Sequence, residues 1–457
     1  MIVRQQVQLM EMYKLTEDSY TGGGGFADGN YLFSYGREMD FPQRQEMAYY
    51  TNYISSIIDA QTEPCFVKDP QREFNDNGII ESFLDDADNN GTNLTSIIKH
   101  ATTYTNLIGN SFIVMDNFAQ EEIPENLKAV IDDRKFPYIY TKECVDVYEY
   151  ETDIFGKLLE ITFFYGMYKP SDYNEDVYLY KRFTPEEIEY FWLEKVKDDE
   201  TGKLVETHRT VSLTSHTLGV VPVVYYNSDV LPVPPKFYSM ASLARAIYNT
   251  ASEIQDLQRS QSFSILLIPS TRGDAEPDDN IVISSHNALF YSSDATHAPS
   301  YISPDSNIMK TNQDTMDKQI NLLIQQADVL GSTAMANGNG QQSGIAYSYR
   351  FFGKQQKLRE SSNIANYLET KIIELLGIFL GTQFEYKVQY PDSFAPTFAE
   401  NKDKLVALEG VANMDISDTV TSMVYGDITS IVGEIMQWDD EQLNSALDSI
   451  TEVQVVV

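Results

Sequence analysis

The sequence has few cysteines, few basic residues relative to acidic ones, and no long hydrophobic run. Its two cysteines, Cys65 and Cys144, lie far apart without a CxxC partner. This argues against a disulfide framework and predicts a reducing compartment. No stretch approaches the roughly 18 apolar residues of a membrane-spanning helix. The N-terminal residues lack the apolar core and cleavage site of a signal peptide. We therefore expect a soluble, non-secreted protein with no membrane partner.

Basic residues are scarce, with 33 Lys and Arg against 68 Asp and Glu, and the formal net charge is −35. A chain this acidic is not drawn to a phosphate backbone, which proteins bind through Lys and Arg. The charge argues against tight nucleic-acid binding but is compatible with a protein that lets DNA slide past. The simpler interpretation is that acidity keeps the chain soluble.

Sequence motifs of common enzymes are also missing. There is no G-x-x-x-x-G-K-[ST] phosphate-binding loop and no G-x-S-x-G nucleophile elbow. The histidines lack the H-x-x-x-H and H-x-x-E-H spacings of metal sites. We therefore expect no catalytic residue, no cofactor and no bound metal. The five histidines are His100, His208, His216, His286 and His297.

One segment imitates the start of a calcium-binding loop. Asp86, Asp88 and Asn90 supply oxygen donors at alternate positions, and Gly91 occupies the sixth. The twelfth position, where such loops need a bidentate Glu, is Ile97. The segment is better interpreted as a turn that caps the following helix.

The first half of the chain changes from a helical to a strand-like period. With 457 residues, of which 42% are hydrophobic, we expect two to four domains. Apolar spacing predicts a helix over Glu46–Ile58, another beginning near Thr92, and a buried strand over Ser111–Met115. Residues 136–226 then alternate with period two, which predicts an antiparallel meander of at least four strands. Its expected strands include 158–168, 176–183, 203–213 and the Pro-interrupted 219–227.

Helical spacing returns after a Pro-rich boundary at Leu231–Pro235. It predicts a helix over 239–262, a short β-rich insert over 263–305 with strands near 263–268, 281–284 and 288–292, and a helix over 306–330. The last helix has a nearly heptad apolar seam. Such a seam occurs both in coiled coils and in ordinary packing within one chain. Its residues are Met309, Met316, Ile320, Leu323, Ala327 and Leu330.

An uncharged stretch with three glycines, Gly331–Ser343, interrupts this pattern and is typical of a mobile polar loop. A long helix over about 344–380 follows, with Gly353 as an expected kink. The tail begins with a strand over Phe384–Tyr390, and helices are expected to start near Thr397 and Ser417.

Basic side chains gather on the long helix, against the acidic background. Arg350, Lys354 and Lys357 share one face of a helix, and Lys310 and Lys318 lie on the helix before it. One interpretation is a solvated face or salt bridges to acidic surface. The other is weak contact with DNA phosphates in a channel, or with carboxylates of a neighbouring subunit.

The order of parts from residue 220 onward resembles portal proteins of long-tailed bacteriophages. Those proteins carry a sheet-rich wing that ends in a short I/V-P-V strand with an Asn close behind, here Val221–Asn227. An N-x-x-S-[DE] helix signature follows, here Asn249–Glu253. After a β insert, a second helix and a loop, S-G-x-A opens a long helix, here Ser343–Ala346. The resemblance spans most of the chain, and its specific portion is the order of parts over 220–350.

This resemblance implies an α+β portal fold with a mixed helix and antiparallel-sheet wing, long stem helices, a small β-rich clip, a kinked tunnel helix and a helical crown. It implies no enzymatic activity. The corresponding ranges are a wing over 1–238, stem helices over 239–262 and 306–330, a clip over 263–305, a tunnel loop over 331–343, a tunnel helix over 344–381, and a C-terminal wing or crown region over 382–457.

The resemblance also implies a homo-oligomeric ring of about twelve subunits at one capsid vertex, in a virion assembled in the bacterial cytoplasm. The implied partners are double-stranded DNA passing through, a separate terminase motor that hydrolyses ATP, the major capsid or scaffold protein, and a head–tail adaptor. The tunnel loop would exchange hydrogen bonds with phosphate or water without an electrostatic trap. Its polar residues are Asn337, Asn339, Gln341, Gln342 and Ser343.

Two alternatives stay open at this point. The chain could be another ring-forming head–tail connector or adaptor, although such adaptors are generally much shorter. It could also be an unrelated α+β hydrolase that uses scattered carboxylates. That hydrolase would be a compact monomer with a catalytic pair, and the sequence offers no pair with recognisable spacing.

Overall fold

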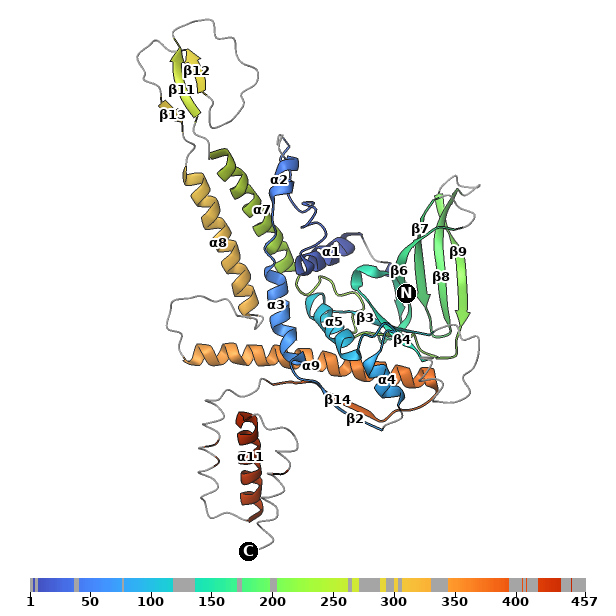
Figure 1. Ribbon diagram of the computed structural model, residues 1–457. Helices are drawn as coiled ribbons and strands as arrows, with labels where there is room; N and C mark the ends of the chain where they lie inside the picture. Colours follow the sequence, from blue (N-terminus) through green and yellow to red (C-terminus); the bar gives the residue numbers. More distant parts are fainter. Residues whose placement is uncertain are drawn as a thin grey trace. The chain divides into compact units, whose positions relative to one another are not determined.

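The computed structural model describes residues 3–4, 7–36, 41–75, 78–117, 136–170, 175–197, 204–261, 265–270, 288–292, 300–302, 306–329, 344–393, 405, 408, 418–436 and 445 (Figure 1). The chain divides into two compact units, residues 1–392 and 393–457. Each unit is described separately below.

A six-stranded antiparallel sheet with the order β1-β5-β6-β7-β8-β9 dominates the middle of the first unit. The predicted meander is therefore confirmed, with β6 matching its expected bounds. The strands are β1 (Val3–Arg4), β5 (Val147–Thr152), β6 (Leu158–Tyr168), β7 (Val177–Phe183), β8 (Glu187–Lys197) and β9 (Leu204–Ser215).

The turn between β5 and β6 shows how local chemistry sets this topology. The Asp153 carboxylate accepts hydrogen bonds from the backbone N–H groups of Phe155 and Lys157, each at 2.8 Å. Gly156 has a positive φ of 82°, which glycine adopts without the strain of a Cβ atom. The hairpin therefore closes at the Asp-x-x-Gly sequence.

A second, three-stranded sheet has the order β10-β3-β4 and lies in the core. Every residue of β3 is buried, which confirms the predicted strand. The strand expected over 219–227 is much shorter, because only Val223 and Val224 form β10. Pro222 has no N–H to donate, and only its carbonyl group bonds β3, at Met115. The strands are β3 (Phe112–Asp116), β4 (Tyr138–Lys142) and β10 (Val223–Val224).

Helices of the N-terminal region cover this core. The helix predicted over Glu46–Ile58 was wrong, because α2 ends at Met47 and α3 begins at Tyr53. Asn52 ends the gap by accepting a hydrogen bond from the Ser55 N–H, which makes it the N-cap of α3. The helices are α1 (Val7–Thr21), α2 (Phe41–Met47), α3 (Tyr53–Thr62), α4 (Ile79–Asp85) and α5 (Leu94–Leu107), with short 3₁₀ turns η1 (Glu63–Phe66) and η2 (Cys144–Asp146).

Two long helices, α7 (Tyr238–Gln261) and α8 (Ser306–Val329), confirm the predicted pair. A small sheet is inserted between them in the chain, with the order β12-β11-β13. Two of its expected strands are present, β13 was not predicted, and the expected strand at 281–284 lies outside the described residues. The strands are β11 (Ile265–Ser270), β12 (Ala288–Ser292) and β13 (Ser300–Ile302).

Helix α9 (Gly344–Leu380) is the longest described helix, with 37 residues. Helix α9 continues through Gly353, the position of the expected kink, without a break in the helix (Figure 1). Strand β14 (Tyr386–Gln389) then pairs antiparallel with β2 (Gln71–Phe74), which joins the end of this unit to its beginning.

In the second unit, α11 (Asp418–Met436) confirms the helix expected near Ser417, and the start expected near Thr397 lies outside the described residues. The fold is thus α+β with mainly antiparallel sheets, as predicted, and the β11–β12 pair is parallel. None of the helices in the described ranges is both long and apolar enough to cross a membrane.

Candidate functional site

Helices α7 and α8 form an antiparallel hairpin. Met240 and Ala244, near the start of α7, belong to the same buried cluster as Leu323 and Ala327, near the end of α8. Met316 and Ile320 also pack against this cluster. The predicted seam of α8 is therefore ordinary packing within one chain, which was the simpler of its two interpretations.

The Asn-x-x-Ser-Glu signature on α7 holds the N-terminal segment against this helix. The Asn249 side chain accepts a hydrogen bond from the Phe33 N–H at 2.7 Å and donates one to the Tyr31 carbonyl at 3.0 Å. Ser252 accepts from the Arg44 guanidinium, and Glu253 accepts from the Tyr35 hydroxyl. The side chains of the signature therefore hold the N-terminal segment in place on α7.

The Asn that follows the short Val-Pro-Val strand has a similar role. The Asn227 side-chain amide donates to the Gly109 carbonyl at 2.7 Å, and its backbone N–H approaches the Asn110 side-chain oxygen. Gly109 has a φ of 117°, which disfavours any side chain at that position. These bonds fix the loop after β10 to the turn between α5 and β3.

Helix α9 is fastened to the N-terminal region by a buried ion pair. The Glu369 carboxylate is fully buried and lies 2.8 and 3.0 Å from two nitrogens of Arg72 on β2. It also accepts hydrogen bonds from the hydroxyls of Tyr386 and Tyr390. Burial, and next the Glu369 charge, raise the pKa of both tyrosines. Sequence reasoning missed this site, since its four members are scattered over more than 300 residues.

The basic positions predicted for a channel or a subunit contact differ in their surroundings. Lys310 and Lys318 are exposed on α8, and Lys354 is half-buried on α9. Lys357 lies 2.7 Å from Glu360, whose other carboxylate oxygen is bound by Lys236. Although burial opposes ionisation of Glu360, these two ammonium groups lower its pKa. Lys357 is therefore paired within the chain. The side chain of Arg350 lies outside the described residues.

The predicted tunnel loop also lies outside the described residues. This applies to Asn337, Asn339, Gln341, Gln342 and Ser343, so no geometry is assigned to them.

Two acidic side chains, Glu143 and Glu17, lie near the start of η2. Glu143 is buried, and one of its carboxylate oxygens lies 3.7 Å from His100 and 3.4 Å from the Ser111 hydroxyl. Burial, and next the charge of Glu17, raise the pKa of Glu143 well above its ordinary value. Burial also raises the pKa of Glu17, on α1, to about 7. These residues come from different elements, so sequence spacing could not group them.

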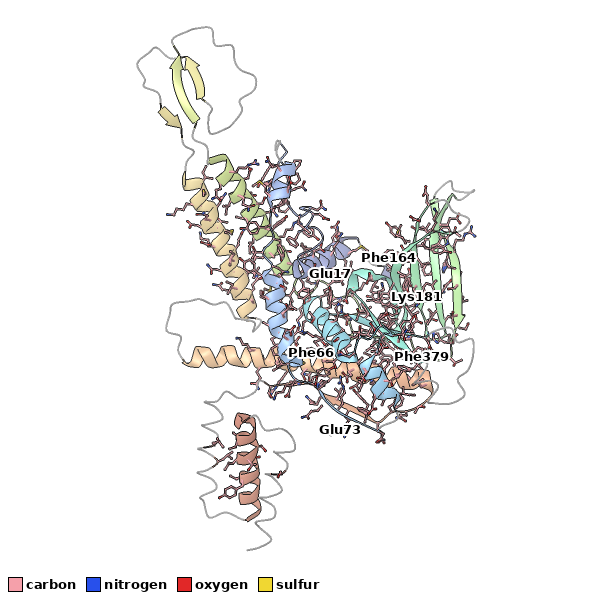
Figure 2. All side chains as sticks on the ribbon, in the orientation of Figure 1. Glu17, Phe66, Glu73, Phe164, Lys181 and Phe379 are labelled. Carbon is pink, nitrogen blue, oxygen red and sulfur yellow. The ribbon has the colours of Figure 1, made fainter. Side chains whose placement is uncertain are left out.

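A second buried charge lies in the six-stranded sheet. The Lys181 side chain is nearly fully buried and forms an ion pair with Asp116, and its ammonium lies 4.6 Å from the ring centre of Tyr190 (Figure 2). Aromatic faces stabilise a cation in such a position. The arrangement has the features of a structural pair, because the ammonium is enclosed by protein.

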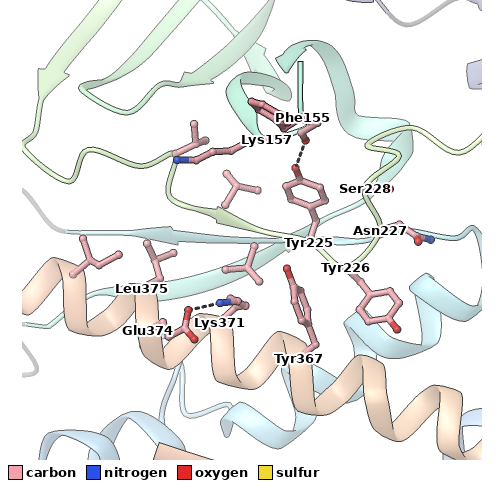
Figure 3. A pocket seen from close by; sticks show the side chains of 15 residues that line it. Phe155, Lys157, Tyr225, Tyr226, Asn227, Ser228, Tyr367, Lys371, Glu374 and Leu375 are labelled. Carbon is pink, nitrogen blue, oxygen red and sulfur yellow. Dashed lines mark hydrogen bonds and ion pairs between the residues drawn. The ribbon is translucent and has the colours of Figure 1, made fainter. Parts of the chain in front are cut away.

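A cavity of about 460 Å³ lies between α9, β10 and the β5–β6 turn (Figure 3). Tyr225 donates a long hydrogen bond to the Gly156 carbonyl, and Lys371 pairs with Glu374 on its wall. No group of three potential metal ligands occurs among the described residues.

The calcium-like segment is a capping turn, as predicted. The Asp88 carboxylate accepts from the backbone N–H groups of Asn90 and Thr92, and Asp86 accepts from Gly91. Asn93 then caps α5 through the Ser96 N–H. The carboxylate oxygens are thus used by the turn itself.

No protein-family model matches the sequence, and no curated protein matches it either. Among solved structures, a chain from the neck of an empty gene transfer agent particle is similar over 93% of this chain and 95% of its own length. The sequence identity is 9% and the TM-score 0.37. A chain from the virion of a native gene transfer agent particle is similar over 90% and 98%, at 10% identity and a TM-score of 0.34.

Proposed function

We propose that the chain is a portal subunit. In this proposal about twelve copies form a ring at one capsid vertex of a phage-like virion, and double-stranded DNA passes through during packaging and ejection. The ring is also a docking platform for a terminase motor, the capsid or scaffold protein and head–tail connectors. The chain itself has a structural role and performs no catalysis.

The observation that carries this proposal is the order of elements over 238–380. Two 24-residue helices form a hairpin with a small sheet inserted between them, and an uncharged segment leads to the 37-residue helix α9. At 1.5 Å per residue the hairpin helices are about 36 Å long and α9 is about 55 Å long. These lengths suit a passage that surrounds a DNA duplex.

The charge distribution supports a conduit more than a binding site. A ring of twelve chains at −35 each would carry on the order of −400, which repels phosphate along most of the passage. The uncharged residues of 331–343 would then meet DNA where it is closest, through exchangeable hydrogen bonds. Lys310 and Lys318, which are exposed on α8, would offset the acidity locally.

The alternatives are a different ring-forming connector and an α+β hydrolase. The length of 457 residues and the helix–sheet–helix order favour a portal over a shorter adaptor. Glu369 and Asp116 are each paired with a cation, so the hydrolase is left with Glu17 and Glu143, whose pKa values burial raises, as its candidate carboxylates.

Negative-stain electron microscopy of the purified chain tests the proposal. We expect rings with a central pore, and native mass spectrometry should give a mass close to twelve times 51.9 kDa. A folded protein that stays monomeric at all concentrations, with or without scaffold protein, would contradict a portal.

The role of the uncharged loop is tested by deleting residues 334–341. Rings should still form, because the deletion removes no described core residue, but DNA packaging or retention should fail. A matched control shortens the β8–β9 connection within 198–203 and should package normally. Normal packaging by the 334–341 deletion would show that this loop does not line the passage.

A further inference from the structure

We propose that an exposed patch on α8 packs against an exposed patch on the N-terminal segment beside α7 of a neighbouring copy, head to tail. The first, the α8 stripe, consists of Ile308, Thr315 and Leu322. The second, the N-terminal patch, consists of Phe33, Tyr35, Met47 and Tyr49. This inference rests on the proposed ring and names the surfaces that hold neighbouring subunits together.

The α8 stripe is a second helical seam, beside the one that packs on α7. Its members are seven residues apart, so they lie on one side of the helix. Ile308 and Leu322 are 53% and 52% exposed, which is high for large apolar side chains. A different side of α8 carries the exposed charges Asp314 and Asp317. Ile308 and Leu322 are two heptads apart on this side, with the small polar Thr315 between them, which favours a partner that lies along the helix.

The N-terminal patch is held rigidly on α7. Phe33 and Tyr49 are 54% and 59% exposed, although the backbone of Phe33 is fixed by Asn249. The Arg245 guanidinium lies 4.6 Å from the ring centre of Phe33. On α2, Arg44 is bound by Ser252. An ordered surface of large apolar side chains loses little conformational freedom on binding.

The two patches lie on different sides of the hairpin. Helix α7 packs on α8 through Met240, Ala244 and Ile247, and on the N-terminal segment through Ala241 and Tyr248. Accordingly, α2 and α8 flank α7 on opposite sides (Figure 1). Different patches on opposite sides form a heterologous contact, which repeats from copy to copy and does not stop at a dimer.

The two patches also lie at the same level along α7. Because α7 and α8 are antiparallel, with Ala244 near Leu323, the Ile308–Leu322 stretch lies beside the later turns of α7. The N-terminal segment is anchored over the same turns, from Arg245 to Arg259. Neighbours related by rotation alone, without a shift along the hairpin, therefore bring the patches together. Rotation without a shift closes a ring, whereas a shift would produce a filament. This match identifies a second copy of the chain as the partner.

Disulfide cross-linking of the full-length ring tests the contact. The two native cysteines are fully buried, so they should not compete. We expect the double variant Tyr49→Cys/Leu322→Cys to give a ladder of multimers under oxidation, and each single variant to give none. Dimers from Leu322→Cys alone would reveal a two-fold contact and overturn the proposal.

Charge substitution provides an independent test. Ile308→Glu/Leu322→Glu should raise the concentration needed for assembly by roughly 100-fold, since it places charges in an apolar contact. The control Gln313→Glu/Asn321→Glu adds the same charges to the other side of α8 and should assemble normally. Circular dichroism should show both variants folded. Normal rings from the first variant would overturn the assigned surface and leave the portal proposal standing. A wild-type chain that forms no ring would overturn the portal proposal itself.

Discussion

The buried carboxylate of Glu369 is stabilised by the Arg72 cation, so removing Arg72 should lower the free energy of unfolding. In Arg72→Met the Glu369 carboxylate keeps its burial but loses its cation. An uncompensated buried charge costs about 3–5 kcal/mol, and the free energy of unfolding should fall by that amount. Urea denaturation followed by circular dichroism measures the change.

A matched control comes from Glu73, the residue that follows Arg72 on β2, which faces Lys387 on β14. Lys387 and Glu73 also form an ion pair at 3.2 Å, but their side chains are 82% and 77% exposed. Lys387→Met should therefore change stability by less than about 1 kcal/mol. Equal effects of the two variants would mean that the buried pair does not fasten α9.

The acidic group around η2 predicts a pH dependence of stability. Because folding raises the pKa of Glu17 from 4.5 to about 7, the folded state holds a proton that the unfolded state releases. The contribution of Glu17 to stability should therefore fall as the pH rises from 4.5 to 7 and then level off. Glu17→Gln removes this titration, so its stability should change less over that interval. Thermal melts at several pH values measure the difference, and parallel curves for wild type and variant would refute it.

At the scale of elements, the sequence predicted the long helices well, ends included, and the short N-terminal helices poorly. Helices α7, α8 and α9 fell within two residues of their expected bounds, because each carries a sustained helical period. The failed prediction at Glu46–Ile58 has a local cause. The apolar spacing continues across the non-helical residues between α2 and α3, where Asn52 caps the start of α3. The period of apolar residues does not show where a capping residue starts a new helix.

The candidate site was less predictable than the fold. The Asn249 signature and the Val-Pro-Val strand were recognised as motifs, but their clamping roles depend on Phe33 and Gly109, which are remote in the chain. Lys357 pairs with Glu360 three residues further along α9, a spacing that the sequence does show. The second partner of Glu360, Lys236, is remote in the chain. Long-range partners of this kind leave no periodic trace in the sequence.

At the scale of the whole molecule, net charge should control assembly. Copies that each carry −35 repel one another, while the apolar patches proposed above attract. Added salt screens this repulsion, with a Debye length of about 10 Å at 0.1 M and about 3 Å at 1 M. The ring fraction measured by light scattering should therefore rise with sodium chloride concentration. A ring that dissociates in high salt would indicate that opposite charges hold the subunits together.

The pairing of β2 with β14 has a consequence for how the protein is made. Strand β2 is synthesised early, yet its partner strand and Glu369, the counter-ion of its Arg72, lie about 300 residues later. At typical translation rates of about 5–20 residues per second, β2 waits roughly 15–60 s on the ribosome. During that time Arg72 and one sheet edge have no native partner. The first unit therefore completes its fold only when most of the chain has emerged, and until then the unpaired edge of β2 is open to wrong pairing with other chains.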